Sequence, residues 1–255
     1  MKGIMSRKLL VAIWFLASCL PAFADMRDDF LAGKSRNCPG CDLREISRKR
    51  QDLSGADLTG ANLAGATFHD CKLIGAKLAG ADLTGANLNK SDLTRADLSG
   101  AKLGTALLYA AVLDLAKLHS ADLTGAKLGT ARMTRTDFTD AVLHNADLRR
   151  ARMPQAVFAS SDLTDAWFDF SHLREANFQR ANMTNASLSG AELMVADFKG
   201  ADLTDADALS ANLRGADFSG ATLTRTRLWK ATLTDANLDG AHFLETIMPD
   251  GTTQP

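Results

Sequence analysis

The sequence predicts an all-β protein, a β-solenoid in which the chain winds into a four-sided parallel β-helix of about ten coils. Three observations carry this prediction. Large apolar residues recur every five positions, small residues precede each of them by two positions, and outward charges alternate in sign every 20 positions. The regular part covers residues 51–248, between an N-terminal export and cap region and a short tail at residues 249–255.

Residues 1–24 have the layout of a secretory signal peptide. Basic residues open the segment, a short apolar run follows, and the small-residue site Ala22-Phe-Ala24 ends it. The apolar run has about twelve residues, fewer than the roughly 20 that a membrane-spanning helix needs. We therefore predict cleavage after Ala24 and an exported protein, periplasmic or extracellular.

The same segment offers a second processing site. Leu16-Ala-Ser-Cys19 resembles a bacterial lipobox, which would make Cys19 the lipidated first residue of the mature protein. Leu20-Pro21 is an unusual start for a lipoprotein, so cleavage after Ala24 is favoured and a lipid anchor at Cys19 stays the alternative. Only the lipidated form would be held at a membrane.

The charge balance argues against a nucleic-acid partner. Three of the 29 Lys and Arg residues lie in the export segment, which leaves 26 against 30 Asp and Glu. Binding to nucleic acid requires clustered Lys and Arg, whereas this chain interleaves both signs. We therefore expect no nucleic-acid partner.

Residues 25–50 precede the repeats and are expected to cap the first coil, which blocks pairing at its open edge. This segment contains Cys38-Pro-Gly-Cys41, a candidate disulfide in an exported protein. A redox role is the sharper alternative, but a thioredoxin-like CxxC belongs on a strand–helix–strand unit that is missing here. A zinc site would need two more ligands nearby. Structural use or free thiols are favoured, and a partner-binding arm is a weaker reading of the segment.

The repeat has 40 central residues, from Leu53 to Met248 in steps of five: 27 Leu, 8 Phe, 4 Met and Ala208. Two positions earlier stands Ala in 32 of the 40 units. A helix would spiral these residues around all its sides, and a flat strand would alternate their faces. The backbone must therefore bend once per unit. The central and small residues then point inward, the residue between them points outward, and the last two form a corner, where Gly often stands second.

The outward residues give the number of sides. Five outward Lys residues have Asp at nine of the ten positions 20 residues away, as in the series Asp57, Lys77, Asp97, Lys117 and Asp137. Opposite charges stabilise neighbours on stacked strands by roughly 0.2–1 kcal/mol. Residues 20 apart are therefore predicted to stack, so four sides of five residues complete one coil.

This pattern resembles the pentapeptide repeat family, whose unit is A-(D/N)-L-x-x. Ala56-Asp57-Leu58 and Ala61-Asn62-Leu63 match the unit directly, and the resemblance covers about residues 41–248. It implies a right-handed quadrilateral β-helix, and the handedness comes from the resemblance alone.

The family's best-known function is DNA mimicry, in which acidic members bind DNA gyrase and dimerise through a C-terminal helix. This chain departs from that pattern by its export segment, its interleaved charges and the seven residues after Met248, too few for such a helix. A gyrase-binding DNA mimic is therefore a less favoured reading, and the oligomeric state stays open.

No catalytic, cofactor or metal site is predicted. The outward Asp residues belong to the repeat, the five His residues do not converge, and no known catalytic motif is present. Cys71 occupies an inward position and is expected to be buried and inert. We predict a non-enzymatic scaffold or structural rod that binds a protein the sequence does not identify; an enzyme that uses the CxxC is the least favoured alternative.

One face departs from the repeat and is a candidate docking face. It carries the only Tyr of the chain and both Trp residues that follow the export segment. Contiguous exposed aromatic surface often marks a docking site, although scattered surface apolar residues are ordinary. We define the docking face as Leu107, Tyr109, Trp167, Phe170, Leu209, Trp229 and Ile247.

Overall fold

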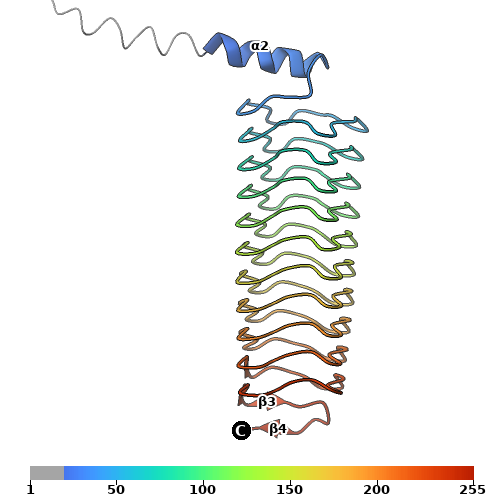
Figure 1. The fold of residues 1–255 in the computed structure, drawn as a ribbon, viewed down its shortest axis with the longest axis vertical. Helices are drawn as coiled ribbons and strands as arrows, with labels where there is room; N and C mark the ends of the chain where they lie inside the picture. Colours follow the sequence, from blue (N-terminus) through green and yellow to red (C-terminus); the bar gives the residue numbers. More distant parts are fainter. Residues whose placement is uncertain (1–19) are drawn as a thin grey trace, which may run out of the picture.

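The computed structural model describes residues 20–255, and this chain winds into a four-sided rod (Figure 1). Cys19 and most of the predicted signal peptide lie outside the described residues. A short helix crosses the N-terminal end of the rod, and the C-terminus lies at the opposite end. In the described part of the chain, no helix is long and apolar enough to cross a membrane.

The register of the coils is 20 residues throughout, as the charge pattern predicted. Parallel bridges join each outward residue to the one 20 positions later, from Asp42↔Asn62 to Arg227↔Ile247. The predicted series Asp57, Lys77, Asp97, Lys117 and Asp137 is joined in this order. The expectation of four five-residue sides per coil is therefore confirmed.

Backbone hydrogen bonds explain why the five-residue unit repeats without a break. In the unit around Leu53, the central N–H donates to Lys72 O at 2.7 Å, and the second corner N–H donates to Ile74 O at 2.9 Å. The next small residue closes the corner, with Ala56 N donating to Leu53 O at 3.0 Å. Outward residues donate to the preceding coil, as Lys72 N does to Gln51 O at 2.9 Å.

The first corner N–H receives its acceptor from a side chain. Ser54 N donates to Asp52 Oδ1 at 3.0 Å, and the same contact recurs at Thr84 N with Asp82 and at Ser219 N with Asp217. Asp and Asn form this turn because the short side chain reaches the backbone two residues later. The Asp or Asn of the repeat unit therefore completes the hydrogen bonding of its own corner.

The core is a column of central residues lined by Ala. Central residues from Leu53 to Leu228 are at most 5% exposed, and the Ala residues that precede them are similarly buried. Phenylalanines stack along one side of the column with ring centroids 4.7–5.0 Å apart; they are Phe138, Phe158, Phe178, Phe198 and Phe218. This spacing matches the rise of one coil.

The second corner residue has a positive φ at every unit from Gly55 to Glu245. The angle is +68° at Gly55, +59° at Val195 and +57° at Phe170. Residues other than glycine reach this left-handed region at a cost of roughly 1–2 kcal/mol. The prediction that glycine suits this position is confirmed, but most units accept the cost with a larger residue.

The N-terminal end differs from the expected boundaries. Helix α2 spans Leu20–Leu31, so it begins ahead of the predicted mature terminus, and the sequence predicted no helix here. The bridge ladder begins at Asp42, inside the segment that the sequence assigned to the cap. Phe30, at the end of α2, is 2% exposed, and Arg48 donates to Phe30 O at 2.7 Å with its guanidinium 5.2 Å from the ring centroid.

The C-terminal end is closed by short strands. β1 (Thr222–Thr224) pairs in parallel with β2 (His242–Leu244), which continues the 20-residue register. β3 (Thr246–Ile247) pairs antiparallel with β4 (Thr253–Gln254), so the predicted tail folds back over the last coil (Figure 1). Leu233, Leu238 and Phe243 of this coil are only half-buried.

Candidate functional site

The structure divides the predicted docking face into exposed and half-buried members. Five side chains are exposed: Leu107, Tyr109, Trp167, Phe170 and Trp229. Leu209 is half-buried, and Ile247 is half-buried within β3. Trp229 lies near the C-terminal end, beside Lys230 and the tail residue Gly251. Exposure therefore concentrates in the middle of the face, around Tyr109, Trp167 and Phe170.

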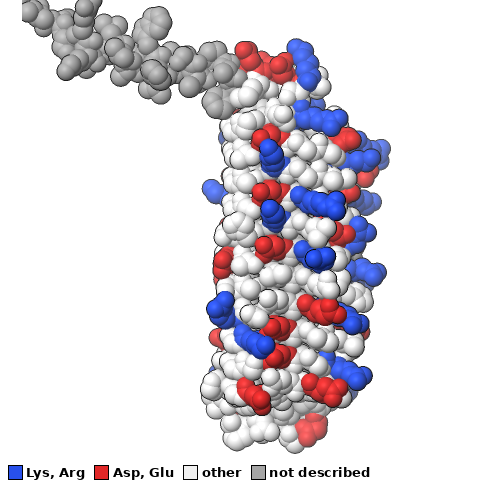
Figure 2. Space-filling model, in the orientation of Figure 1, with Lys and Arg blue, Asp and Glu red and all other residues white. Residues whose placement is uncertain are grey.

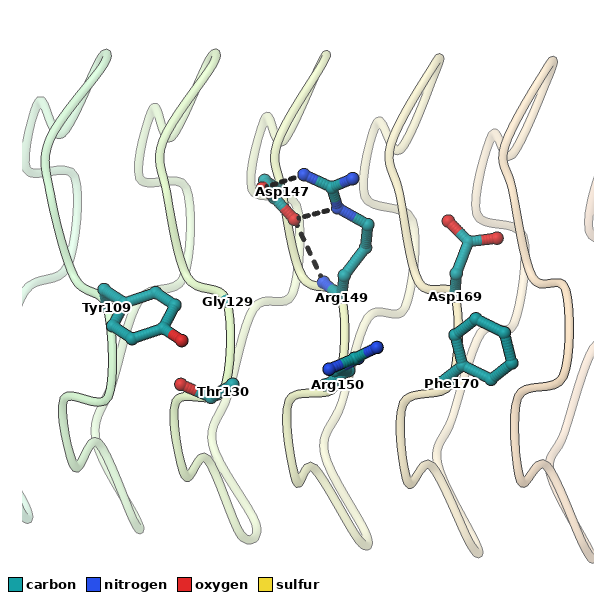
Figure 3. A pocket seen from close by; sticks show the side chains of 8 residues that line it. All are labelled: Tyr109, Gly129, Thr130, Asp147, Arg149, Arg150, Asp169 and Phe170. Atoms are coloured by element: carbon teal, nitrogen blue, oxygen red, sulfur yellow. Dashed lines mark hydrogen bonds and ion pairs between the residues drawn. The ribbon is translucent and has the colours of Figure 1, made fainter.

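A groove of about 410 Å³ lies in this middle region (Figure 3). It crosses four successive coils, which at about 4.8 Å per step is a length of about 14 Å along the rod. Its lining residues are Tyr109, Gly129, Thr130, Asp147, Arg149, Arg150, Asp169 and Phe170. Tyr109 stands at one end and Phe170 at the other (Figure 3).

The depression exists because Gly129 carries no side chain. A Cβ at this position would lie 3.4 Å from two carbons of the Tyr109 ring, which leans over the glycine. Phe170 leans in the same direction along the rod and covers Gly190, where a Cβ would lie 2.8 Å from its ring. Phe170 therefore leans away from the groove and leaves its floor open.

Arg149 is held rigidly in the lining. Its Nε donates to Asp147 Oδ1 at 2.9 Å and its Nη2 donates to Asp147 Oδ2 at 2.8 Å. Its guanidinium carbon also lies 4.9 Å from the ring centroid of Trp167, which Lys127 approaches to 5.6 Å. The hydrogen bonds from Arg149 hold the pKa of Asp147 below its usual range. Trp167, which does not line the groove, therefore supports its wall through Arg149.

The two carboxylates and the remaining donors of the groove differ in their partners. Asp147 is occupied by Arg149, and Asp169 accepts a hydrogen bond from the Ser187 hydroxyl. Among the described residues, the guanidinium of Arg150 and the hydroxyl of Tyr109 have no hydrogen bond or ion pair. Figure 3 shows the Arg150 side chain between Thr130 and Phe170, free of the dashed contacts that hold Arg149. The groove thus combines internally satisfied acceptors with unused donors.

Sequence reasoning found the aromatic residues and missed the rest of the groove. Gly129 is one of two glycines at the first corner position, the other being Gly104, whereas glycine usually stands second. Two adjacent arginines, Arg149 and Arg150, follow one coil later. The misplaced glycine and the arginine pair, sorted by coil, would have marked the site.

The cysteines lie away from this groove. Cys38 and Cys41 are joined as a disulfide with a Cα–Cα distance of 5.4 Å, and they are 0% and 2% exposed. Cys38 occupies a central position and Cys41 the next small position, so the bond lies across a corner of the first coil. Burial raises the pKa of the Cys71 thiol, which keeps it protonated near neutral pH. Within residues 20–255, no His, Cys, Asp and Glu side chains group as metal ligands.

Comparison with known proteins places the repeat. A model of pentapeptide repeats matches in eight copies, over residues 52–89, 91–129, 116–155, 136–169, 171–207 and 211–248. HetL, a pentapeptide repeat protein involved in heterocyst differentiation regulation in the cyanobacterium Nostoc sp. strain PCC 7120, is 30% identical. That alignment covers 88% of this chain and 96% of HetL, with a TM-score of 0.49.

Two further solved structures are more distant. A pentapeptide repeat protein from the Arabidopsis thaliana thylakoid lumen is 29% identical over 49% of this chain and 70% of its own, with a TM-score of 0.33. QnrB1, a plasmid-mediated fluoroquinolone resistance protein, is 19% identical over 76% of this chain and 92% of its own, with a TM-score of 0.27. No curated protein matches significantly. The chain belongs to the pentapeptide repeat family, whose members form right-handed quadrilateral β-helices.

Proposed function

We propose that this protein is a non-enzymatic rod, exported to the bacterial envelope, that binds a protein partner through its docking face. The observation that carries the proposal is the concentration of exposed aromatic side chains on one face, with Tyr109 54% and Phe170 60% exposed. Exposed aromatic residues beside a groove are typical of protein-binding surfaces. Proteins of the pentapeptide repeat family are generally non-enzymatic, which agrees with this role.

The surface charge supports a protein partner over DNA mimicry. Lys and Arg side chains alternate with Asp and Glu over the face seen in Figure 2, so this face has no single-sign field. The burial of Cys38 and Cys41 disfavours thiol exchange, because a redox disulfide must be reached by an attacking thiolate. Gyrase binding and CxxC catalysis are therefore the less favoured functions.

Proximity labelling in intact cells tests the proposal. The double variant Trp167→Ala with Trp229→Ala should keep the fold and lose one labelled envelope protein. The matched control is Ile74→Ala with Leu115→Ala, since these exposed apolar residues belong to another face of the rod. If the docking-face variant labels every protein that the wild type labels, this face does not bind the partner.

A lipid anchor at Cys19 is the alternative mode of envelope attachment. It would make the rod a spacer held at the membrane, with the same coils and no required partner. Mass spectrometry of the mature N-terminus separates the two forms: a free Asp25 supports cleavage after Ala24, and an acylated Cys19 supports the anchor.

A further inference from the structure

We propose that the groove between Tyr109 and Phe170 receives an acidic peptide segment of the partner, with a carboxylate bound by Arg150 and apolar neighbours on the two aromatic rings. This inference rests on the proposed function, because it names the chemistry of the protein that the docking face would bind. It assigns the specificity to Arg150, a residue outside the aromatic set.

The hydrogen-bonding state of the groove argues for an acceptor ligand. Its acceptors are already used, since Asp147 binds Arg149 and Asp169 binds the Ser187 hydroxyl. Its free donors belong to Arg150, which presents five N–H groups in a planar fork, and to the Tyr109 hydroxyl. A carboxylate matches that fork with two parallel hydrogen bonds. The ligand that completes this lining is therefore an anion with planar geometry.

The two lining carboxylates select against a more highly charged anion. Asp147 and Asp169 remain negative near neutral pH, and both lie in the same groove as Arg150. A phosphate dianion would meet their repulsion with one free cation to offset it, whereas a carboxylate carries a single charge. The charge distribution therefore fits an Asp or Glu side chain better than a phosphate group.

The ends of the groove argue for apolar residues on both sides of that carboxylate. Tyr109 and Phe170 expose more than half of their surface and have no apolar partner outside their own column of corners. Phe170 also has a φ of +57°, so the chain holds an exposed aromatic ring in an unfavourable backbone conformation. A groove of about 14 Å accommodates about four extended residues at 3.3–3.4 Å each, which is enough for one acidic residue between two apolar ones.

A peptide titration of the full chain tests the proposal. The probe is a synthetic peptide with blocked ends and the sequence glycine–phenylalanine–aspartate–leucine–glycine; the comparison peptide has asparagine in place of aspartate. Backbone amide NMR shifts at Gly129, Thr130 and Arg150 report occupancy. We expect the aspartate peptide to bind about tenfold more tightly, because a charge-assisted hydrogen bond is lost in the comparison.

Two variants locate the binding. Arg150→Gln should reduce the difference between the two peptides to less than about twofold, since it removes the charge that discriminates them. The matched control is Arg135→Gln, which changes an arginine on another face at the same corner position, with a φ of +55° against +58° for Arg150. Phe170→Gly should weaken both peptides equally while relieving backbone strain. Equal affinities for the two peptides, or an unchanged preference in Arg150→Gln, would overturn the proposal.

Other ligands are outcomes of the same titration. If inorganic phosphate or a tetramer of N-acetylglucosamine shifts these amides and the aspartate peptide does not, the groove binds another chemistry and the inference is wrong. The proposed function is judged separately by labelling in cells. A partner that is lost in the tryptophan double variant but kept in Arg150→Gln would preserve the docking face and reject the carboxylate contact.

Discussion

At the scale of single residues, the outward Asp acts first on its own corner. The sequence predicted that Lys and Asp 20 residues apart attract one another, and their register is confirmed. Of the series Asp57 to Asp137, only Lys77 and Asp57 come within ion-pair distance, at 3.8 Å, and both are well exposed. Exposed pairs contribute little, whereas the corner contact satisfies an N–H that the ladder leaves free. The corner N–H therefore explains the Asp of the unit, and charge pairing only refines the choice.

Asp217 offers a pH test of this role. The hydrogen bond from Ser219 is the main reason that the pKa of Asp217 falls to about 2. Its ionised form therefore stabilises the fold above the ordinary pKa of 3.8, and this contribution disappears as the pH falls through about 2. Carboxyl carbon NMR should give a midpoint near that value, and Ser219→Ala should raise it. A midpoint at the ordinary value in the wild type would contradict the corner assignment.

Val195 tests the cost of the positive φ. It is a β-branched residue, 52% exposed, held at a φ of +59°. Val195→Gly should raise the free energy of unfolding by about 1 kcal/mol, because glycine reaches this conformation without strain. The control Val142→Gly changes an exposed valine in an extended outward position and should lower stability instead. Chemical denaturation measures both, and destabilisation by Val195→Gly would show that its side chain contributes packing.

At the scale of elements, the two ends were the least predictable parts. α2 begins within a stretch whose apolar run and small residues are equally typical of a signal peptide, and it is one short helix without a repeat to support it. The tail forms β4 because the last coil has an open edge at β3, and no pattern in seven residues specifies that pairing. The interior could be predicted because each unit repeats the same constraint, whereas each end has a single solution.

Phe30 tests whether α2 caps the rod. It is almost fully buried and contacts Arg48 through the ring and the carbonyl oxygen. Phe30→Ala should cost the first coil about 3–5 kcal/mol, so hydrogen exchange should accelerate at the Leu43 and Arg48 amides. Exchange at Leu148, in the middle of the rod, should not change, because repeats interact mainly with neighbours. Equal acceleration along the whole chain would show that the cap controls global stability instead.

At the scale of the whole molecule, the period and register followed from sequence, but the groove did not. The 20-residue register places Tyr109, Gly129, Arg149 and Asp169 in one column of corners, so their proximity was accessible. The direction in which Tyr109 and Phe170 lean was not, because it depends on which neighbouring corner is a glycine. The rod therefore presents a predictable framework, and its binding chemistry depends on a few side chains that interrupt the repeat.

The same framework makes inward positions sensitive and outward positions tolerant. Leu148 is fully buried in the central column, so Leu148→Asp removes apolar contacts and buries an unpaired charge. We expect a loss of more than about 4 kcal/mol and the collapse of several coils. Leu107→Asp makes the same chemical change on the outside of the same face, where the stacked neighbours are Asn87 and Lys127. It should stay within about 0.5 kcal/mol of the wild type. Circular dichroism and limited proteolysis distinguish the two variants. A Leu148→Asp protein that unfolds like the wild type would contradict a core built from the central residues, because a column of coils has no second place to put that charge.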